Sequence, residues 1–208
     1  MLYKVNREKC RACGICTMAC RSEAVSIVEG RAQIDPSKCI DCGNCFKKCR
    51  FQAIEKKDTE LYDRLCARMR ALAEDVESNI SNLANASALL FDQLADLNWA
   101  GFYLLRGGVL ELGPFQGKPA CTRIEMGKGV CGTAAAAGST VKVDDVHQFP
   151  GHIACDSASN SEIVIPLQAG GKLLGVLDID SPLYSRFDEF DRQGLEAFAR
   201  CIEEIWKE

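Results

Sequence analysis

The chain has 208 residues, of which 47% are hydrophobic and 26% charged, with 13 cysteines and a net charge of −4 at pH 7. Its first eight residues lack the apolar run of a signal peptide, and no stretch approaches the roughly 18 apolar residues of a membrane span, so we expect neither export nor a membrane partner. In a reducing cytoplasmic compartment, dense cysteines indicate metal or redox chemistry and exclude a scaffold held by disulfides.

The charge is distributed unevenly along the chain. Residues 1–57 hold 12 Lys and Arg against 6 Asp and Glu, whereas residues 58–208 hold 13 against 23. A basic segment can bind nucleic acid, but no aromatic stacking platform accompanies these lysines, so we expect no nucleic-acid partner. We expect two domains, spanning residues 1–57 and 58–208.

A cysteine motif occurs twice in the first domain, starting at Cys10 and again at Cys39. Each copy has the spacing C-x2-C-x2-C-x3-C, which is typical of proteins that hold two [4Fe–4S] clusters. We expect each copy to form a short strand, a cluster-binding loop and a helical turn, with a hairpin between residues 25–28 and 32–34. Gly14 and Gly43 suit tight loops, where backbone N–H groups must approach the cluster sulfides.

Over about 55 residues this domain resembles bacterial two-[4Fe–4S] ferredoxins, in which the fourth cysteine of each motif binds the other cluster. Arg21 and Arg50 stand where that family usually has proline, so we expect raised reduction potentials and more labile clusters. Zinc remains an alternative occupant, because sites of four cysteines also bind it. The resemblance assigns one cluster to Cys10, Cys13, Cys16 and Cys49, and the other to Cys39, Cys42, Cys45 and Cys20.

The second domain is expected to begin with helix. Apolar residues recur at helical spacing through residues 58–97, and Asp58-Thr59 offers the start a cap, which predicts a long helix after residue 57.

The pattern then changes to that of strands joined by glycine-rich turns. A short helix is expected within residues 127–138, and an amphipathic helix over residues 187–206 closes the chain. Together these elements predict an α+β fold with an antiparallel sheet flanked by helices. The predicted strands are residues 99–105, 109–115, 140–143, 163–167 and 173–179.

Four segments of the second domain carry a recognisable pattern, at residues 98–103 (Asn-Trp-Ala-Gly-Phe-Tyr), 113–121, 129–132 and 146–156. Together they resemble the free-methionine-(R)-sulfoxide reductases, which are catalytic GAF domains acting on the free amino acid. The resemblance covers residues 60–205, and the spacing of three cysteines within it matches the family.

Reducing a sulfoxide requires an attacking thiolate, an acid and a second thiol that removes the resulting sulfenic acid. The resemblance places the attacking thiol at Cys155, the main resolving thiol at Cys121 and a secondary one at Cys131. The start of a helix would favour a thiolate at Cys131, and a charged His152 would do the same for Cys155. Two further cysteines, Cys66 and Cys201, fall on apolar helix positions and are expected to be structural.

Three acidic residues, Glu162, Asp178 and Asp180, fall on predicted adjacent strands. Asp178 and Asp180 are two apart and share a face, which by itself suits either a site or an ordinary exposed strand. The resemblance implies that all three are substrate-binding and proton-donor carboxylates. It also implies that Trp99 and Tyr103 contact the substrate methyl group.

The leading interpretation is reduction of free L-methionine (R)-sulfoxide to methionine through a cysteine disulfide. The ferredoxin domain would supply electrons for regenerating the disulfide, with an external donor to the clusters or thioredoxin as partner, and we expect a homodimer formed through helices. The alternatives are a redox or oxygen sensor whose GAF domain binds a ligand without catalysis, and an electron carrier whose GAF domain only docks a partner. The three reductase-type cysteines favour the enzyme, because neither alternative needs them.

Overall fold

The computed structural model describes residues 3–153 and 156–207. The chain folds into two compact units, Met1–Leu61 and Tyr62–Glu208, so the division falls slightly later than the predicted 57/58 boundary. Within the described ranges, no helix combines the length and the apolar character needed to cross a membrane.

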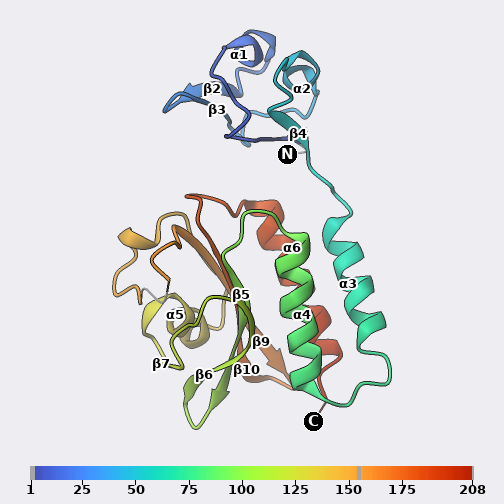
Figure 1. Ribbon diagram of the computed structural model, residues 1–208, viewed down its shortest axis with the longest axis vertical. Helices are drawn as coiled ribbons and strands as arrows, with labels where there is room; N and C mark the ends of the chain where they lie inside the picture. The colour runs from blue at the N-terminus through green and yellow to red at the C-terminus, as the bar shows by residue number, and fades with distance from the viewer. Residues whose placement is uncertain (1–2, 154–155, 208) are drawn as a thin grey trace. The chain divides into compact units, whose positions relative to one another are not determined.

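The first unit consists of two small antiparallel sheets and two helical turns (Figure 1). The predicted hairpin is present as β2 paired with β3, and the first and last strands, β1 and β4, pair with each other. The elements are β1 (Tyr3–Val5), α1 (Ile15–Ala19), β2 (Val25–Val28), β3 (Arg31–Ile34), α2 (Asn44–Lys48) and β4 (Ile54–Lys56).

Each helical turn of the first unit begins directly after a left-handed glycine, at Gly14 with φ 75° and at Gly43 with φ 71°. This conformation is costly for residues that carry a Cβ. At Gly43 an added Cβ would also lie 2.5 Å from Tyr3 Oη, so the Tyr3 side chain would have to move.

The second unit is built on a six-stranded antiparallel sheet with the order β7-β6-β5-β10-β9-β8. The two predicted hairpins appear as β5–β6 and β9–β10, while the short strand β7 had no clear signal in the sequence. The elements are α3 (Leu61–Leu72), α4 (Asn79–Gln93), β5 (Trp99–Arg106), β6 (Val109–Gly117), β7 (Arg123–Glu125), α5 (Gly129–Ala137), β8 (Val141–Val143), a 3-10 turn (Val146–Gln148), β9 (Ser161–Ala169), β10 (Lys172–Ser181) and α6 (Glu189–Glu204).

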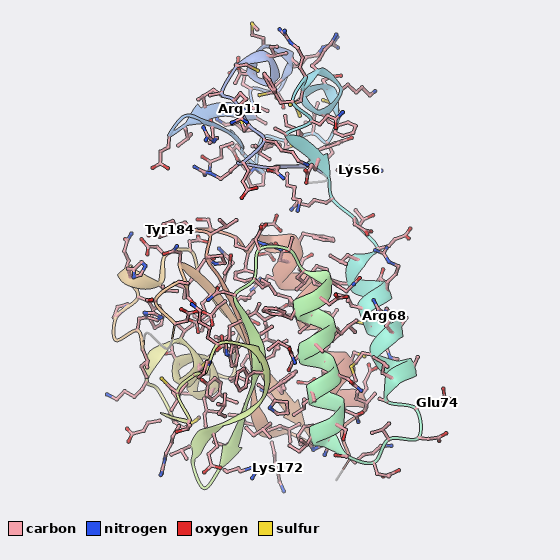
Figure 2. All side chains as sticks on the ribbon, viewed as in Figure 1. Arg11, Lys56, Arg68, Glu74, Lys172 and Tyr184 are labelled. Carbon is pink, nitrogen blue, oxygen red and sulfur yellow. The ribbon has the colours of Figure 1, made fainter. Side chains whose placement is uncertain are left out.

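Helices cover both faces of this sheet. Figure 1 shows α4 and α6 on one face and α5 on the other, and side chains fill the layers between them (Figure 2). The largest fully buried side chains include Phe102, Leu83 and Phe198, which come from β5, α4 and α6. The sheet therefore forms a rigid platform, and its α5 side carries the site described below.

The long helix predicted after residue 57 is wrong, because the segment forms two helices. α3 ends at Leu72, and Asp75 takes a left-handed φ of 60° that a helix cannot continue through. Ser78 then caps α4, its side chain accepting a hydrogen bond from the backbone N–H of Ser81. Helical periodicity continues through the turn, so it did not reveal the break.

α3 packs against α6 through a mixed polar and apolar contact. Tyr62 Oη donates a 2.8 Å hydrogen bond to Asp191, and Arg70 forms an ion pair with Glu204. The Cys201 thiol lies at this contact and donates to a backbone carbonyl of α3 at 3.5 Å. Burial raises the pKa of Cys201 to about 11, which suits a structural residue and not a reactive one.

Candidate functional site

In the first unit, four cysteines from both motifs line one cavity: Cys10, Cys13, Cys16 and Cys49. Cys49 belongs to the second motif and joins three cysteines of the first. The backbone N–H of Ala32 donates to Cys10 Sγ at 3.3 Å, and that of Ala53 donates to Cys49 Sγ at 3.2 Å. Such bonds stabilise sulfur that carries negative charge, as cluster-bound thiolates do.

The remaining cysteines gather in the reciprocal way. The pKa of Cys45 is raised by burial and further by the nearby Cys20 and Cys39 thiols, so the fourth cysteine of the first motif lies beside those of the second. The backbone N–H of Ala24 donates to Cys20 Sγ at 3.2 Å. The donor set thus fits two four-cysteine clusters with crossed ligation, and each bound cluster would exchange one electron at a time.

In the second unit, a cleft opens between α5 and the sheet. The space between atoms amounts to about 510 Å³, including solvent at its mouth. Strands β5, β9 and β10 supply its floor and α5 supplies one wall. Residues 119–120, 152–153, 156 and 159 supply the rim. All five aromatic and acidic residues proposed for the substrate line it: Trp99, Tyr103, Glu162, Asp178 and Asp180.

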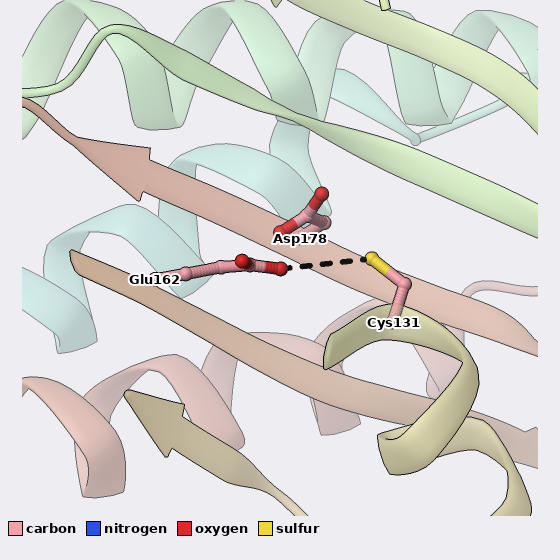
Figure 3. A group of neighbouring side chains, drawn as sticks. All are labelled: Cys131, Glu162 and Asp178. Carbon is pink, nitrogen blue, oxygen red and sulfur yellow. Dashed lines mark hydrogen bonds between the residues drawn. The ribbon is translucent and has the colours of Figure 1, made fainter. Parts of the chain in front are cut away.

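The strand register explains why the acidic residues meet. Asp180 of β10 lies opposite Glu162 of β9, and Asp178 lies two residues along the same face. Cys131, in the first turn of α5, faces them, and its thiol donates to Glu162 Oε1 at 3.9 Å (Figure 3). Glu162 and Asp178 are each only 6% exposed, so they form a buried cluster. The alternative of an ordinary half-exposed strand face, which the sequence also allowed, is therefore excluded for these two residues.

Dehydration dominates the electrostatics of this cluster. Burial raises the pKa of Glu162 well above its usual value, and the neighbouring Asp178 and Asp180 raise it further. Burial also raises the pKa of Asp178 to about 6, and that of Asp180 well above its usual value. Burial therefore favours the protonated carboxyl groups, which can donate a proton, whereas a bound cation would favour the ionised ones.

An aromatic wall faces the carboxyl groups. Trp99 stacks on Tyr103 at a centroid distance of 5.9 Å and on Phe115 at 5.3 Å. Tyr103 Oη donates a 3.0 Å hydrogen bond to the backbone carbonyl of Cys121, which ties the wall to the loop carrying that cysteine. The wall offers an apolar surface suited to a methyl group and sulfur.

Two of the three proposed thiols lie in the described residues, and their environments differ. Cys121 is partly exposed on the loop after β6 and packs against the core near the cleft. Cys131 is buried, and burial together with the neighbouring carboxylates raises its pKa well above the usual value, so the predicted thiolate at this helix start is wrong. Cys155 lies outside the described residues, but its neighbours Ile153 and Asp156 both line the cleft.

A charged His152 is likewise not supported. Burial is the main cause that lowers the pKa of its imidazole, so the neutral ring dominates at neutral pH. Its Nε2 lies 3.9 Å from Glu162 Oε2, close to the carboxyl cluster.

Asp156 is the last residue of the 146–156 segment and received no role from the sequence. In the structure it organises the rim of the cleft. Its carboxylate accepts hydrogen bonds from the backbone N–H of Ala158 at 2.9 Å and from Asn98 Nδ2 at 3.1 Å, and it pairs with Lys118 at 3.2 Å. These contacts, the backbone bond first, lower the pKa of Asp156. In the sequence, its position directly after the proposed attacking Cys155 indicated that it could belong to the site.

Family models match both units. The model described as GAF domain matches residues 79–204, more than half of the chain, and the model described as 4Fe-4S dicluster domain matches residues 9–53. The chain therefore has an N-terminal dicluster domain, which holds two [4Fe–4S] clusters, followed by a GAF domain.

Relatives of known activity match the second unit closely. The free methionine-R-sulfoxide reductase of Escherichia coli is 52% identical over 147 residues, covering 71% of this chain and 89% of the relative. The enzyme of the same name from Saccharomyces cerevisiae is 46% identical over 151 residues, covering 69% and 84%. The chain belongs to the free methionine-R-sulfoxide reductase family. Members of this family are oxidoreductases, which favours the enzyme over a sensor whose GAF domain binds a ligand without catalysis.

Solved structures of the same reductase family share the fold of the second unit. The Staphylococcus aureus fRMsr in reduced form is 53% identical with a TM-score of 0.67, covering 69% of this chain and 94% of that one. The Neisseria meningitidis free methionine-R-sulfoxide reductase, solved in complex with its substrate, is 42% identical with a TM-score of 0.69, covering 73% and 91%.

The raised pKa of Asp178 predicts how the stability of this reductase-family unit changes with pH. The folded cleft favours the protonated form of Asp178. Burying this carboxyl therefore costs no free energy of unfolding below its unfolded-state pKa near 4, and the cost grows as the pH rises through 6. Asp178→Asn removes that cost. Relative to the parent, the variant should gain free energy of unfolding between pH 4.5 and 7.5, by at most about 3 kcal/mol.

Urea unfolding followed by tryptophan fluorescence measures this gain, because both tryptophans, Trp99 and Trp206, lie in the second unit. Asp92→Asn, at an exposed carboxylate on α4, is the control and should show no such pH-dependent gain. A gain at Asp178 that is equal at both pH values would contradict the burial argument.

Proposed function

We propose that this protein reduces free L-methionine (R)-sulfoxide to L-methionine through a cysteine sulfenic acid and a disulfide, with its own ferredoxin domain as the electron donor. The observation that carries the proposal is the cleft in which buried carboxyl groups face an aromatic wall. That arrangement suits a zwitterion with an ammonium at one end and a methyl sulfoxide at the other.

Binding would use the two sides of the cleft. The substrate ammonium would pair with Glu162, Asp178 or Asp180, which lie on adjacent strands and are short of positive charge. The methyl and sulfur would lie against Trp99 and Tyr103, the stacked pair on β5. Burial of the carboxyl groups keeps water from competing for the ammonium, which strengthens the ion pair.

The first chemical step forms a sulfur–sulfur contact. The Cys155 thiolate would attack the sulfoxide sulfur while a protonated carboxyl of the cluster donates to the sulfoxide oxygen, for which the raised pKa of Glu162 makes it the best suited group. The oxygen passes to Cys155 as a sulfenic acid, and methionine leaves.

The second step restores a disulfide. The Cys121 thiol would attack the sulfenic acid, forming the Cys121–Cys155 disulfide and releasing water. Cys121 suits this role better than Cys131, because it is partly exposed on a loop whereas Cys131 is buried with a strongly raised pKa. Two electrons and two protons then regenerate both thiols.

Substitution of single cysteines tests this sequence of steps. Cys155→Ser should release no methionine from free methionine (R)-sulfoxide, because no other thiol makes the first contact. Cys121→Ser should release about one methionine per protein and then stall at the sulfenic acid. Both results are measured by quantifying methionine over time with thioredoxin as reductant.

Cys66→Ser is the matched control, since Cys66 is buried in α3 away from the cleft, and it should turn over normally. Normal cycling of Cys121→Ser would instead make Cys131 the resolving thiol, and full turnover of Cys155→Ser would contradict the proposal.

Two arguments support this electron route: the ferredoxin and reductase domains belong to one chain, and the difference in reduction potential favours electron transfer to the disulfide. A low-potential ferredoxin near about −400 mV and a thioredoxin-like disulfide near about −270 mV differ by roughly 130 mV, or about 6 kcal/mol for two electrons. Two one-electron clusters also match one two-electron disulfide. Arg21 and Arg50 reduce this driving force to the extent that their charges raise the cluster potentials.

Anaerobic single-turnover experiments test this route. The full-length protein with both clusters reduced is mixed with free methionine (R)-sulfoxide in the absence of thiol, and cluster absorbance is followed beside methionine release. The clusters should reoxidise as methionine appears. Cys45→Ser, which damages one cluster site, should lose this reaction while keeping turnover with thioredoxin.

If the intact protein shows no reoxidation of the clusters but turns over normally with thioredoxin, the ferredoxin domain is not the donor.

Two further proposals concern where the protein works and how it assembles. They are a location in a reducing cytoplasm, in which these thiols and clusters persist, and a homodimer formed through the helices of the second unit.

A further inference from the structure

Three ligand-type side chains in the cleft converge on one point. One atom each of Cys131, Glu162 and Asp178 lies within 4.8 Å of the other two, and all three residues are buried (Figure 3). They come from α5, β9 and β10, which are packed elements of the fold and not mobile loops. Such placement holds ligand atoms in position before any ion arrives.

The separation of these atoms is close to what a zinc-type ion requires. With Zn–S near about 2.3 Å and Zn–O near about 2.1 Å, a tetrahedral site places sulfur and oxygen about 3.6 Å apart. Cys131 Sγ and Glu162 Oε1 lie 3.9 Å apart. This pair is therefore within a few tenths of an ångström of the required separation, and the remaining pairs lie within 4.8 Å.

The cluster also has unused coordinating capacity. Asp178 is 6% exposed, and its Oδ1 accepts no hydrogen bond from the described residues. A buried carboxylate oxygen without a partner carries a large desolvation cost, which a cation would remove. His152 lies nearby at the rim, with Nε2 3.9 Å from Glu162 Oε2, but outside the set of ligand atoms that lie within 4.8 Å of one another.

We propose that this cleft binds a zinc-type divalent cation through Cys131 Sγ and carboxylate oxygens of Glu162 and Asp178. One thiolate and two carboxylates form a mixed donor set that selects borderline-soft ions over magnesium or calcium. The site is separate from the cysteines of the dicluster domain, which provide sulfur only.

Binding has a consequence for the proposed reaction. The ion occupies the carboxylates proposed for the substrate ammonium, so it excludes the substrate, and its coordination of Cys131 displaces the thiol proton. The ion binds whether or not the protein reduces sulfoxides, but its effect as a competitive inhibitor rests on the proposed function.

Binding is tested on the full-length protein with both clusters assembled, under argon, with ¹¹³Cd²⁺ as the NMR-visible substitute for zinc. One resonance should appear in the region of a single sulfur with oxygen ligands, distinct from that of four sulfurs. Cys131→Ser should abolish it, and Cys66→Ser, the control outside the cleft, should retain it.

Zinc affinity by calorimetry should fall at least tenfold in Cys131→Ser and in Asp178→Asn, with folding verified by circular dichroism. If Cys131→Ser does not fold, Asp178→Asn and Glu162→Gln carry the test. Cadmium seen only at four-sulfur positions, or equal zinc affinity in parent and folded variants, would overturn the site.

Turnover separates this inference from the proposed function. With thioredoxin as reductant, which avoids a chelating small dithiol, zinc should raise the apparent KM for free methionine (R)-sulfoxide and leave kcat unchanged. Cys131-dependent zinc binding in a protein that never reduces the sulfoxide would sustain the metal site and refute the proposed function. Normal turnover that zinc does not inhibit would refute the competition.

Discussion

The burial of carboxyl groups without a fixed cation is the constraint on which the candidate site depends. The antiparallel register of β9 and β10 brings Glu162 and Asp178 together beneath α5, and neither forms an ion pair with a lysine or arginine of the described residues. Ionising such buried groups costs several kcal/mol unless a group of opposite charge binds beside them. The fold therefore favours a bound cation, and both the ammonium of an amino acid and a divalent metal ion satisfy that demand.

Hydrogen bonds also connect this rigid cluster to the loops at the rim. Tyr103, on the central strand β5, donates to the backbone carbonyl of Cys121, while Asp156 accepts a hydrogen bond from Asn98 and pairs with Lys118. In the proposed reaction the sheet would orient the substrate and the loops would carry the thiols, and such chemistry loses rate when the reacting atoms are misplaced by an ångström. The cleft therefore depends on strand register as much as on the identity of its cysteines.

Much of this arrangement follows from local sequence signals. The doubled cysteine spacing, the glycines before α1 and α2, and the alternation in β5, β6, β9 and β10 all have direct structural meaning, and they predict the two-domain α+β fold. The turn at Asp75 escaped prediction because the helical period continues across it. The state of Cys131 escaped because its helix start favours a thiolate, whereas its raised pKa comes from tertiary burial beside residues 31 and 47 positions away in the chain, Glu162 and Asp178. Local pattern predicts elements and candidate residues, but not the dielectric environment that tertiary packing creates.

The central claim is that the acidic cleft recognises the free ammonium of the substrate, and blocking that group tests it most directly. The measurement compares kcat/KM for free methionine (R)-sulfoxide with that for its N-acetyl derivative, which keeps the sulfoxide and the carboxylate but has no positive charge. Leaving a buried carboxylate without its partner costs about 3–5 kcal/mol, so the account predicts a loss of at least about a hundredfold in kcat/KM. Comparable values for the two compounds would contradict it.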